Sequence, residues 1–130
     1  MGEQPLILVV DDEENFREIF GARLSAEGLR IETAQNGKEA LEKVKIMKPD
    51  LILMDVQMPV MDGASAVLKL REDPGTKDIK VAFLTSLGDP NREILETSKK
   101  FSAEIGAQAY LKKTDDLDML VEEIKKLISF

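Results

Sequence analysis

The stretch LILVVDD, residues 6–12, joins a short continuous apolar run to a pair of acids. Such a run is typical of a parallel strand buried on both faces. The pattern returns as LILMD at 51–55, VAFLT at 81–85 and AYLKK at 109–113, and each run ends in a residue that can handle a phosphoryl group. The carboxyl ends of parallel strands share one edge of a sheet, where open α/β sheets place their ligands. We therefore expect these four ends to form one site.

Helical patterns alternate with these strands. A further strand is predicted at Arg30–Ala34, and apolar residues at helical spacing predict helices over 16–24, 40–47, 64–71, 94–105 and 117–128. The strict alternation of strands and helices favours a doubly wound, five-stranded parallel sheet with helices on both faces, because consecutive parallel strands must be joined by a crossover connection, usually a helix. The strand order 2-1-3-4-5 would place the first and third strands side by side where the winding reverses.

Composition excludes several kinds of chemistry. With 130 residues and 43% hydrophobic content, the chain is expected to form one domain, 1–130. It has no cysteine and no histidine, so thiolate nucleophiles, Ser-His-Asp triads and phosphohistidine are ruled out. A net charge of −7 disfavours nucleic acid as a partner. No stretch suits a membrane span or a secretory signal, so a cytoplasmic protein is expected.

Three acids are expected at the predicted strand ends: Asp11, Asp12 and Asp55. Asp11 and Asp12 alone could be helix-capping residues, and Glu13 and Glu14 are expected only to favour the amino end of the next helix. Carboxylates within roughly 5 Å repel each other by about 3 kcal/mol at an effective dielectric of about 20. Clustered acids therefore imply a hard divalent cation, and Mg²⁺ suits such an all-oxygen site.

Thr85 and one lysine complete the predicted site. Thr85 by itself reads as an ordinary strand residue, but beside the acids it becomes a donor to a phosphoryl oxygen. Lys112 and Lys113 could be solubilising charges; alternation along a strand lets only one of them reach the site, and spacing does not say which. A carboxylate, a divalent cation, a hydroxyl and an ammonium suffice for in-line phosphoryl transfer to an aspartate.

Four motifs together resemble one family. They are VVDD at 9–12, DVQMPVMDG at 55–63, LTS at 84–86 and GAQAYLKK at 106–113. On these motifs the chain, from Leu6 to the last helix, resembles the receiver domain of response regulators in two-component signalling, which implies a flavodoxin-like (βα)5 fold.

The resemblance implies a role for each matched residue. Asp55 would be the phosphoacceptor, with Asp12 binding Mg²⁺ directly, Asp11 helping through water and the backbone carbonyl of Gln57 completing the metal ligands. Thr85 would bind the phosphoryl group, and the small Ser86 would leave it room. The family's spacing selects Lys113 over Lys112. Tyr110 would be the aromatic that swings inward on activation, although an ordinary amphipathic tyrosine at a sheet edge is equally compatible with the sequence.

Two departures from the family pattern stand out. Thr114 follows the lysine where the family usually has proline, often after a cis peptide bond. The stretch 85–113 is also longer than usual, with the extra residues expected at 88–91. The resemblance implies that partners bind the face formed by the fourth helix, fifth strand and fifth helix, so the longer stretch could change partner choice.

The resemblance implies a phosphorylation-dependent switch rather than an enzyme. Asp55 would take a phosphoryl group from the phosphohistidine of a sensor kinase or a phosphotransfer protein, and the altered face would bind a downstream protein. The alternative is an interaction module of the same fold that works without phosphorylation. An aspartate-dependent phosphatase of the haloacid-dehalogenase type would need an acid where Gln57 stands, and a flavin-binding module would need a phosphate-binding loop in place of Asp11 and Asp12.

Overall fold

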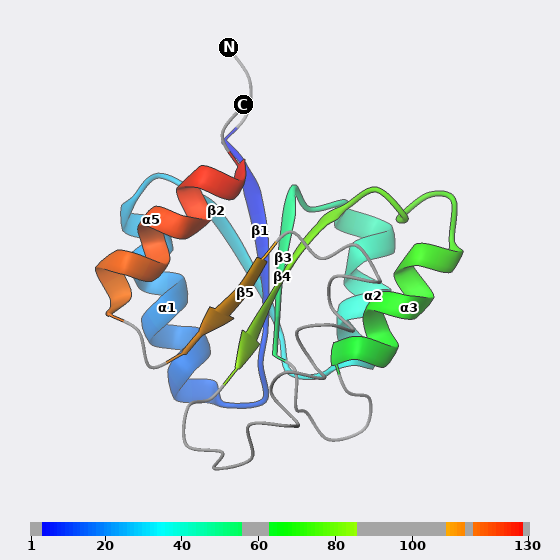
Figure 1. The fold of residues 1–130 in the computed structure, drawn as a ribbon, viewed down its shortest axis with the longest axis horizontal. Helices are drawn as coiled ribbons and strands as arrows, with labels where there is room; N and C mark the ends of the chain where they lie inside the picture. Colours follow the sequence, from blue (N-terminus) through cyan, green and yellow to red (C-terminus); the bar gives the residue numbers. More distant parts are fainter. Residues whose placement is uncertain (1–3, 56–62, 86–108, 114–115, 129–130) are drawn as a thin grey trace.

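A five-stranded parallel sheet forms the centre of the molecule (Figure 1). The computed structural model describes residues 4–55, 63–85, 109–113 and 116–128. The strands, in chain order, are β1 (Leu6–Val10), β2 (Arg30–Ala34), β3 (Leu51–Asp55), β4 (Lys80–Thr85) and β5 (Ala109–Lys112). Their spatial order is β2-β1-β3-β4-β5, which confirms the predicted topology.

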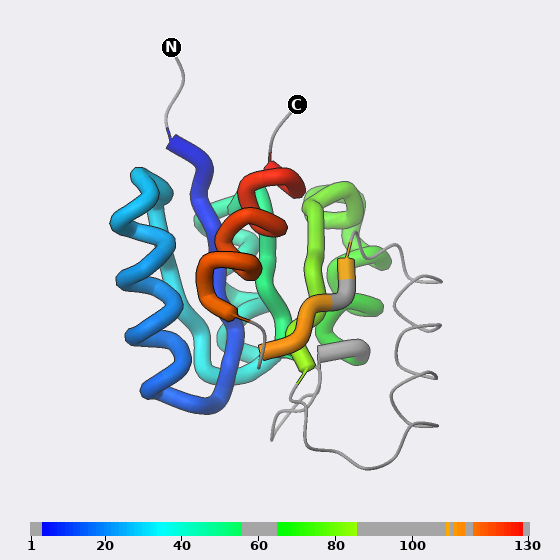
Figure 2. The backbone as a smooth tube through the Cα atoms, turned by 60° about the vertical axis from the view of Figure 1, so that its left-hand side comes forward, coloured from blue at the N-terminus to red at the C-terminus, as the bar shows by residue number. Residues whose placement is uncertain are grey.

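Two helices cover each face of the sheet among the described residues (Figures 1 and 2). The helices are α1 (Glu14–Ala26), α2 (Gly37–Met47), α3 (Gly63–Glu72) and α5 (Leu117–Ile128). Helices α1 and α5 pack on one face, and α2 and α3 pack on the other. The helix predicted over 94–105 lies outside the described residues.

The sheet divides the hydrophobic core in two because successive strand residues point to opposite faces. In β1, Ile7 and Val9 pack toward α1 and α5, whereas Leu8 and Val10 pack toward α2 and α3. Each half contains a fully buried phenylalanine, Phe20 in the α1–α5 core and Phe83 in the α2–α3 core. All five residues of β3 are buried, as expected for a central strand covered on both faces.

Local signals explain where the first helices begin and end. Helix α1 is followed by Gly28, whose φ of 87° is the left-handed conformation that glycine adopts without strain. Helix α2 begins after Asn36, whose side chain accepts a hydrogen bond from the Glu39 N–H at 2.9 Å. The connections on either side of β2 are therefore short.

The strands are in register at their carboxyl ends. Val10 lies opposite Met54, Asp55 opposite Leu84, and Thr85 opposite Lys112. Strand β3 runs one residue beyond its last apolar residue, so that Asp55 ends it, and Thr85 likewise ends β4. The register therefore carries residues from distant parts of the chain to one edge of the sheet, the lower edge in Figure 1.

Candidate functional site

The candidate site lies at the carboxyl edge of the sheet, where β1 and β3 are neighbours. Asp11 follows β1 directly, Asp55 ends β3, and Lys113 follows β5. The chain leaves β1 for α1 on one face and continues from β3 toward α3 on the other. This is the switch point at which doubly wound sheets bind ligands.

Three carboxylates meet at this point. One carboxylate oxygen from each of Asp11, Asp12 and Asp55 lies within 4.8 Å of the others. Asp11 and Asp55 are buried, whereas Asp12 is exposed to solvent. The structure thus places a cluster of acids half inside the protein, where their mutual repulsion is least screened by water.

Asp11 is held from three sides. Its Oδ1 accepts a hydrogen bond from the Glu13 N–H at 2.9 Å, and its main-chain oxygen accepts one from Arg17 Nη1 at 2.6 Å. Its Oδ2 is fully buried and forms an ion pair with Lys113 Nζ at 2.5 Å. Burial raises the pKa of Asp11, and the neighbouring Lys113 ammonium and Glu13 N–H only partly offset this effect.

Lys113 supplies the positive charge of the site. Its Nζ lies 2.5 Å from Asp11 Oδ2, 2.9 Å from Glu13 Oε1 and 3.3 Å from Asp55 Oδ2. The ammonium also sits over the Phe16 ring, 4.8 Å from its centroid, in a cation–π contact. Burial by itself lowers the pKa of Lys113, but the contacts with the three carboxylates outweigh it, so the pKa is raised and the side chain stays charged.

The backbone explains why Lys113, and not Lys112, contacts the acids. Strand β5 ends at Lys112, opposite Thr85, and the Lys113 N–H then donates to the Thr85 carbonyl at 2.8 Å. This bond extends the pairing of β4 and β5 by one residue, to Lys113. Because successive strand residues point to opposite faces, the Lys113 side chain reaches the acid cluster and that of Lys112 points the other way. Thr85 itself, partly exposed, stands at the end of β4 beside this bond.

Glu13 corrects an expectation from the sequence. The position after two acids favours a helix amino end, and Glu13 is indeed the N-cap residue of α1. Its side chain makes no capping hydrogen bond, however, and accepts one from Lys113 Nζ at 2.9 Å instead. Only the fold could reveal this contact, because Glu13 and Lys113 are a hundred residues apart in the chain.

Comparison with known proteins identifies the family of this fold. The family model "Response regulator receiver domain" matches residues 7–125. The chain belongs to this family. The identification confirms the resemblance seen in the four sequence motifs, and it makes the chain a module of two-component signalling rather than a classical enzyme.

Individual relatives agree with the family match. The response regulator PleD of Caulobacter vibrioides is 38% identical over 124 residues, which cover 95% of this chain and 26% of PleD. A putative response regulator from Chloroflexus aurantiacus superposes with a TM-score of 0.84 at 30% identity, covering 96% of this chain and 98% of the other. The receiver domain therefore spans only about a quarter of PleD.

One solved relative was crystallised with a metal complex. The response regulator TrrA of Thermotoga maritima, in complex with Mg²⁺ and BeF, superposes with a TM-score of 0.80 at 36% identity, covering 95% of this chain and 99% of TrrA. In this receiver domain, the carboxylates of Asp11, Asp12 and Asp55 lie close enough together to form an all-oxygen donor set. Such a set fits Mg²⁺, which prefers oxygen ligands and retains several waters.

Several predicted features fall outside the described residues. These are Gln57, Ser86, the stretch 88–91 and the Lys113–Thr114 peptide bond. Tyr110 lies in β5, but its side chain is likewise not among the described parts. Among the described residues, no helix combines the length and the apolar character that a membrane span requires.

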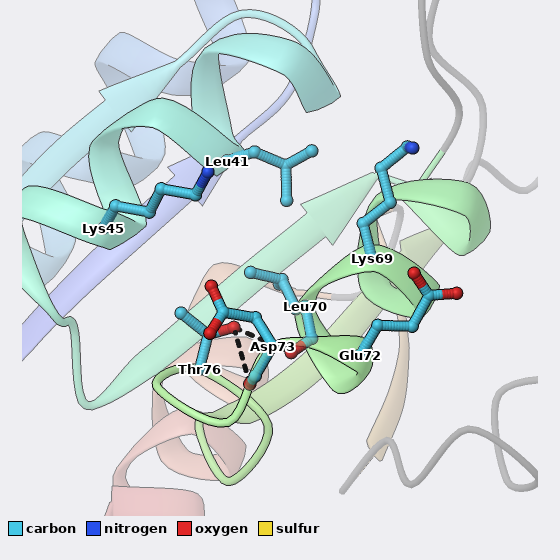
Figure 3. A pocket seen from close by; sticks show the side chains of 7 residues that line it. All are labelled: Leu41, Lys45, Lys69, Leu70, Glu72, Asp73 and Thr76. Atoms are coloured by element: carbon cyan, nitrogen blue, oxygen red, sulfur yellow. Dashed lines mark hydrogen bonds between the residues drawn. The ribbon is translucent and has the colours of Figure 1, made fainter.

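A hollow of about 320 Å³ lies between α2 and α3 (Figure 3). Its lining consists of Leu41, Lys45, Lys69, Leu70, Glu72, Asp73 and Thr76. The buried Thr76 hydroxyl is already used, because it donates to the Leu70 carbonyl at 2.7 Å. Lysines and acids are mixed in this lining, and it contains no residue of the acid cluster.

Proposed function

We propose that the receiver domain is a phosphoacceptor switch, in which Asp55 takes a phosphoryl group from the phosphohistidine of a sensor kinase or a phosphotransfer protein. The observation that carries this proposal is the position of the Asp55 carboxylate. It ends a central strand, within 4.8 Å of the carboxylate oxygens of Asp11 and Asp12, and its Oδ2 lies 3.3 Å from the Lys113 ammonium. A buried carboxylate beside an ammonium and beside acids that could hold a divalent cation suits a nucleophile that receives a phosphoryl group.

The proposed reaction is an in-line displacement. A carboxylate oxygen of Asp55 attacks the phosphorus, the bond between phosphorus and the histidine nitrogen breaks, and the imidazole leaves with the electron pair and takes up a proton. The product is an aspartyl phosphate on Asp55. Such transfers depend more on positioning and charge neutralisation than on added acid or base groups.

The surrounding residues prepare Asp55 for this step. Asp11, Asp12, Asp55 and the backbone carbonyl of Gln57 would hold Mg²⁺, which when bound neutralises the negative charge shared between the acids and the phosphoryl oxygens. Lys113 contributes a fixed ammonium that is already positioned at Asp55. Thr85, at the end of β4, would donate its hydroxyl to a phosphoryl oxygen. The domain thereby assists its own phosphorylation and dephosphorylation.

The proposed output is a change at the surface beside this edge. New contacts to Thr85 and Lys113 would act on β4 and β5, which are joined at these residues by the Lys113 N–H bond to the Thr85 carbonyl. Tyr110, two residues before Lys112 in β5, would move inward with them. The face formed by the fourth helix, β5 and α5 would then bind a downstream protein partner. We propose that residues 1–130 form a single receiver domain.

Intact-mass spectrometry tests the proposal. The protein is incubated with acetyl phosphate, with and without Mg²⁺, and compared with Asp55→Asn, which keeps the shape of the side chain but removes the nucleophile. We expect one phosphoryl adduct that requires Mg²⁺ and is absent from the variant. A wild-type protein that takes up no phosphoryl group, either from acetyl phosphate or from phosphorylated sensor kinases, would instead support the phosphorylation-independent interaction module.

A further inference from the structure

We propose that Glu13 is a positioning residue that holds Lys113 in the unphosphorylated protein and must release it when a phosphoryl group arrives. This inference rests on the proposed phosphorylation of Asp55 and adds a regulatory element to the same site. Its basis is the hydrogen bond from Lys113 Nζ to Glu13 Oε1 at 2.9 Å, which is shorter than the 3.3 Å between Lys113 Nζ and Asp55 Oδ2.

The ammonium of Lys113 is fully committed before any phosphoryl group binds. A lysine ammonium has three N–H donors, and three carboxylates lie within 3.3 Å of Nζ. A phosphoryl oxygen on Asp55 would need one of these donors, because the Phe16 ring occupies a further side of the ammonium. One existing contact therefore has to weaken for Lys113 to bind the phosphoryl group.

Glu13 is the partner that can be released at least cost. Its side chain is 60% exposed, so water can solvate the carboxylate as soon as it leaves Lys113. The side chains of Asp11 and Asp55 are 0% and 6% exposed, and separating either from the cation would leave a buried charge without a counter-ion. Because Glu13 is the most exposed of the three carboxylates, the incoming phosphoryl group displaces it, and not Asp11 or Asp55, from Lys113.

The alternative role for Glu13 is that of a helix N-cap. Its backbone is extended, with φ −89° and ψ 110°, as at other N-cap positions, but its side chain makes no capping hydrogen bond. The negative charge still favours the amino end of α1 through the helix dipole. A test must therefore separate the contact with Lys113 from the effect of the charge alone.

The contact has a kinetic signature. The contact between Glu13 and Lys113 is present before phosphorylation and lost in the transition state. Removing it should therefore raise the rate of phosphorylation. Dephosphorylation starts from a state in which Glu13 has already released Lys113, so its rate should not change. Exposed ion pairs contribute little, so we expect the rate of phosphorylation by acetyl phosphate to rise by roughly two- to fivefold.

Two substitutions at position 13 and one control separate the possibilities. Glu13→Gln keeps the length of the side chain and removes its charge. Glu13→Asp keeps the charge and is a better capping residue, but it is one methylene shorter and should not reach Lys113. Glu14→Gln removes the neighbouring exposed charge at the start of α1, which is not among the three carboxylates that contact Lys113.

The proposal predicts that both position-13 variants are phosphorylated faster than the wild type, with unchanged dephosphorylation, and that Glu14→Gln matches the wild type. It is overturned if Glu13→Gln matches the wild type or is slower. It is also overturned if Glu13→Asp matches the wild type while Glu13→Gln is faster, or if Glu14→Gln is accelerated equally, because charge alone would then account for the rates.

A second measurement reads the contact without phosphorylation. In the metal-free protein, the NMR signals of the Lys113 side chain should shift in both Glu13 variants and stay in place in Glu14→Gln. Unchanged Lys113 signals in Glu13→Gln would overturn the proposal. Should the wild type accept no phosphoryl group at all, the proposed function fails, and this measurement still decides whether Glu13 holds Lys113.

Discussion

Lys113 offsets part of the negative charge at the site, because its ammonium contacts Asp11, Glu13 and Asp55 at once. In the low dielectric of a buried site, such a cation does more than a surface lysine could. Its positive charge opposes the effect of burial on the pKa of Asp11 and so favours the ionised carboxylate, which metal binding needs. The stability of the fold and the reactivity of the site are therefore coupled through one side chain.

Replacing this lysine should expose the coupling. Lys113→Met keeps much of the apolar stem but leaves Asp11 and Asp55 without their cation. We expect the free energy of unfolding in metal-free buffer to fall by about 1–3 kcal/mol, with part of the loss restored by Mg²⁺. Urea unfolding measures the change, and Lys112→Met, which should lie within about 0.5 kcal/mol of the wild type, is the matched control. Equal stability of Lys113→Met and the wild type would contradict the charge balance described here.

Metal binding should appear as stabilisation. Mg²⁺ that binds only the folded protein raises its stability by mass action, by about 2.7 kcal/mol at a concentration one hundred times the dissociation constant. Asp12 is exposed, so Asp12→Asn should alter the metal-free protein little while losing most of this response. Thermal unfolding with and without Mg²⁺ reports the difference, with Glu14→Gln as the control. An undiminished response in Asp12→Asn would exclude that carboxylate from the metal site.

At the scale of residues, the sequence predicts the types of group at the site better than their contacts. The acids after the first and third strands are visible because each follows an apolar run directly. The choice between Lys112 and Lys113 depends on where pairing with β4 ends, which the run AYLKK does not show. The contact of Glu13 is hidden for a related reason: its partner Lys113 follows β5, far along the chain, and the local pattern shows only a helix start.

At the scale of elements, two ion pairs join α5 to α1 and to Glu27, the residue that follows α1. Arg23 contacts Asp118, and Glu27 contacts Lys125. The Lys125 side chain lowers the pKa of Glu27 below its usual value of 4.5. A carboxyl whose pKa is lower in the folded state stabilises the protein above the unfolded-state pKa, and this contribution is lost as the pH falls through the folded-state value.

This sign gives a pH-dependent prediction. Glu27→Gln should lower the melting temperature by a few degrees at most near neutral pH, and the difference from the wild type should vanish at a pH below the pKa of Glu27. Thermal unfolding across this range measures it, and added salt should shrink the neutral-pH difference because exposed charges are screened. If the melting temperature of Glu27→Gln stayed below that of the wild type in acid, the ion pair would not be the cause of the difference.

Element ends follow local chemistry where a specific residue marks them. Gly28 marks the end of α1, because glycine adopts the left-handed conformation without strain, and Asn36 marks the start of α2, because its side chain caps the helix. The strands β3 and β4 extend beyond their apolar runs to Asp55 and Thr85, since pairing with neighbours continues past the last hydrophobic residue. Apolar patterning marks where a strand is buried, which is not the same as where its pairing stops.

At the scale of the molecule, one sheet separates two cores and should make them unfold together. Phe20 and Phe83 are fully buried on opposite sides of it. Phe20→Ala and Phe83→Ala should each cost about 3–5 kcal/mol, whereas Ile19→Ala, at a side chain on α1 that is 60% exposed, should stay within about 0.5 kcal/mol. Urea unfolding should show a single transition in each case. A second transition in one phenylalanine variant would mean that the two layers unfold separately.

The overall topology was predictable because alternation leaves few choices. Helical patterns separate four buried apolar runs and one further strand, and this alternation favours a parallel sheet with right-handed crossovers. The acids at the ends of the first and third strands favour the strand order that makes these two strands neighbours. Cross-strand registers, such as Thr85 opposite Lys112, depend on packing of the assembled sheet and are not written in any one segment.

The most direct test of the central claim locates the phosphoryl group itself. The protein is phosphorylated with acetyl phosphate and Mg²⁺, then treated with borohydride, which reduces an aspartyl phosphate to homoserine, and the peptides are sequenced by mass spectrometry. Homoserine at position 55, and at neither 11 nor 12, is the predicted result. Reduction at Asp11 or Asp12, or a stable adduct that resists borohydride, would contradict the assignment of Asp55 as the phosphoacceptor.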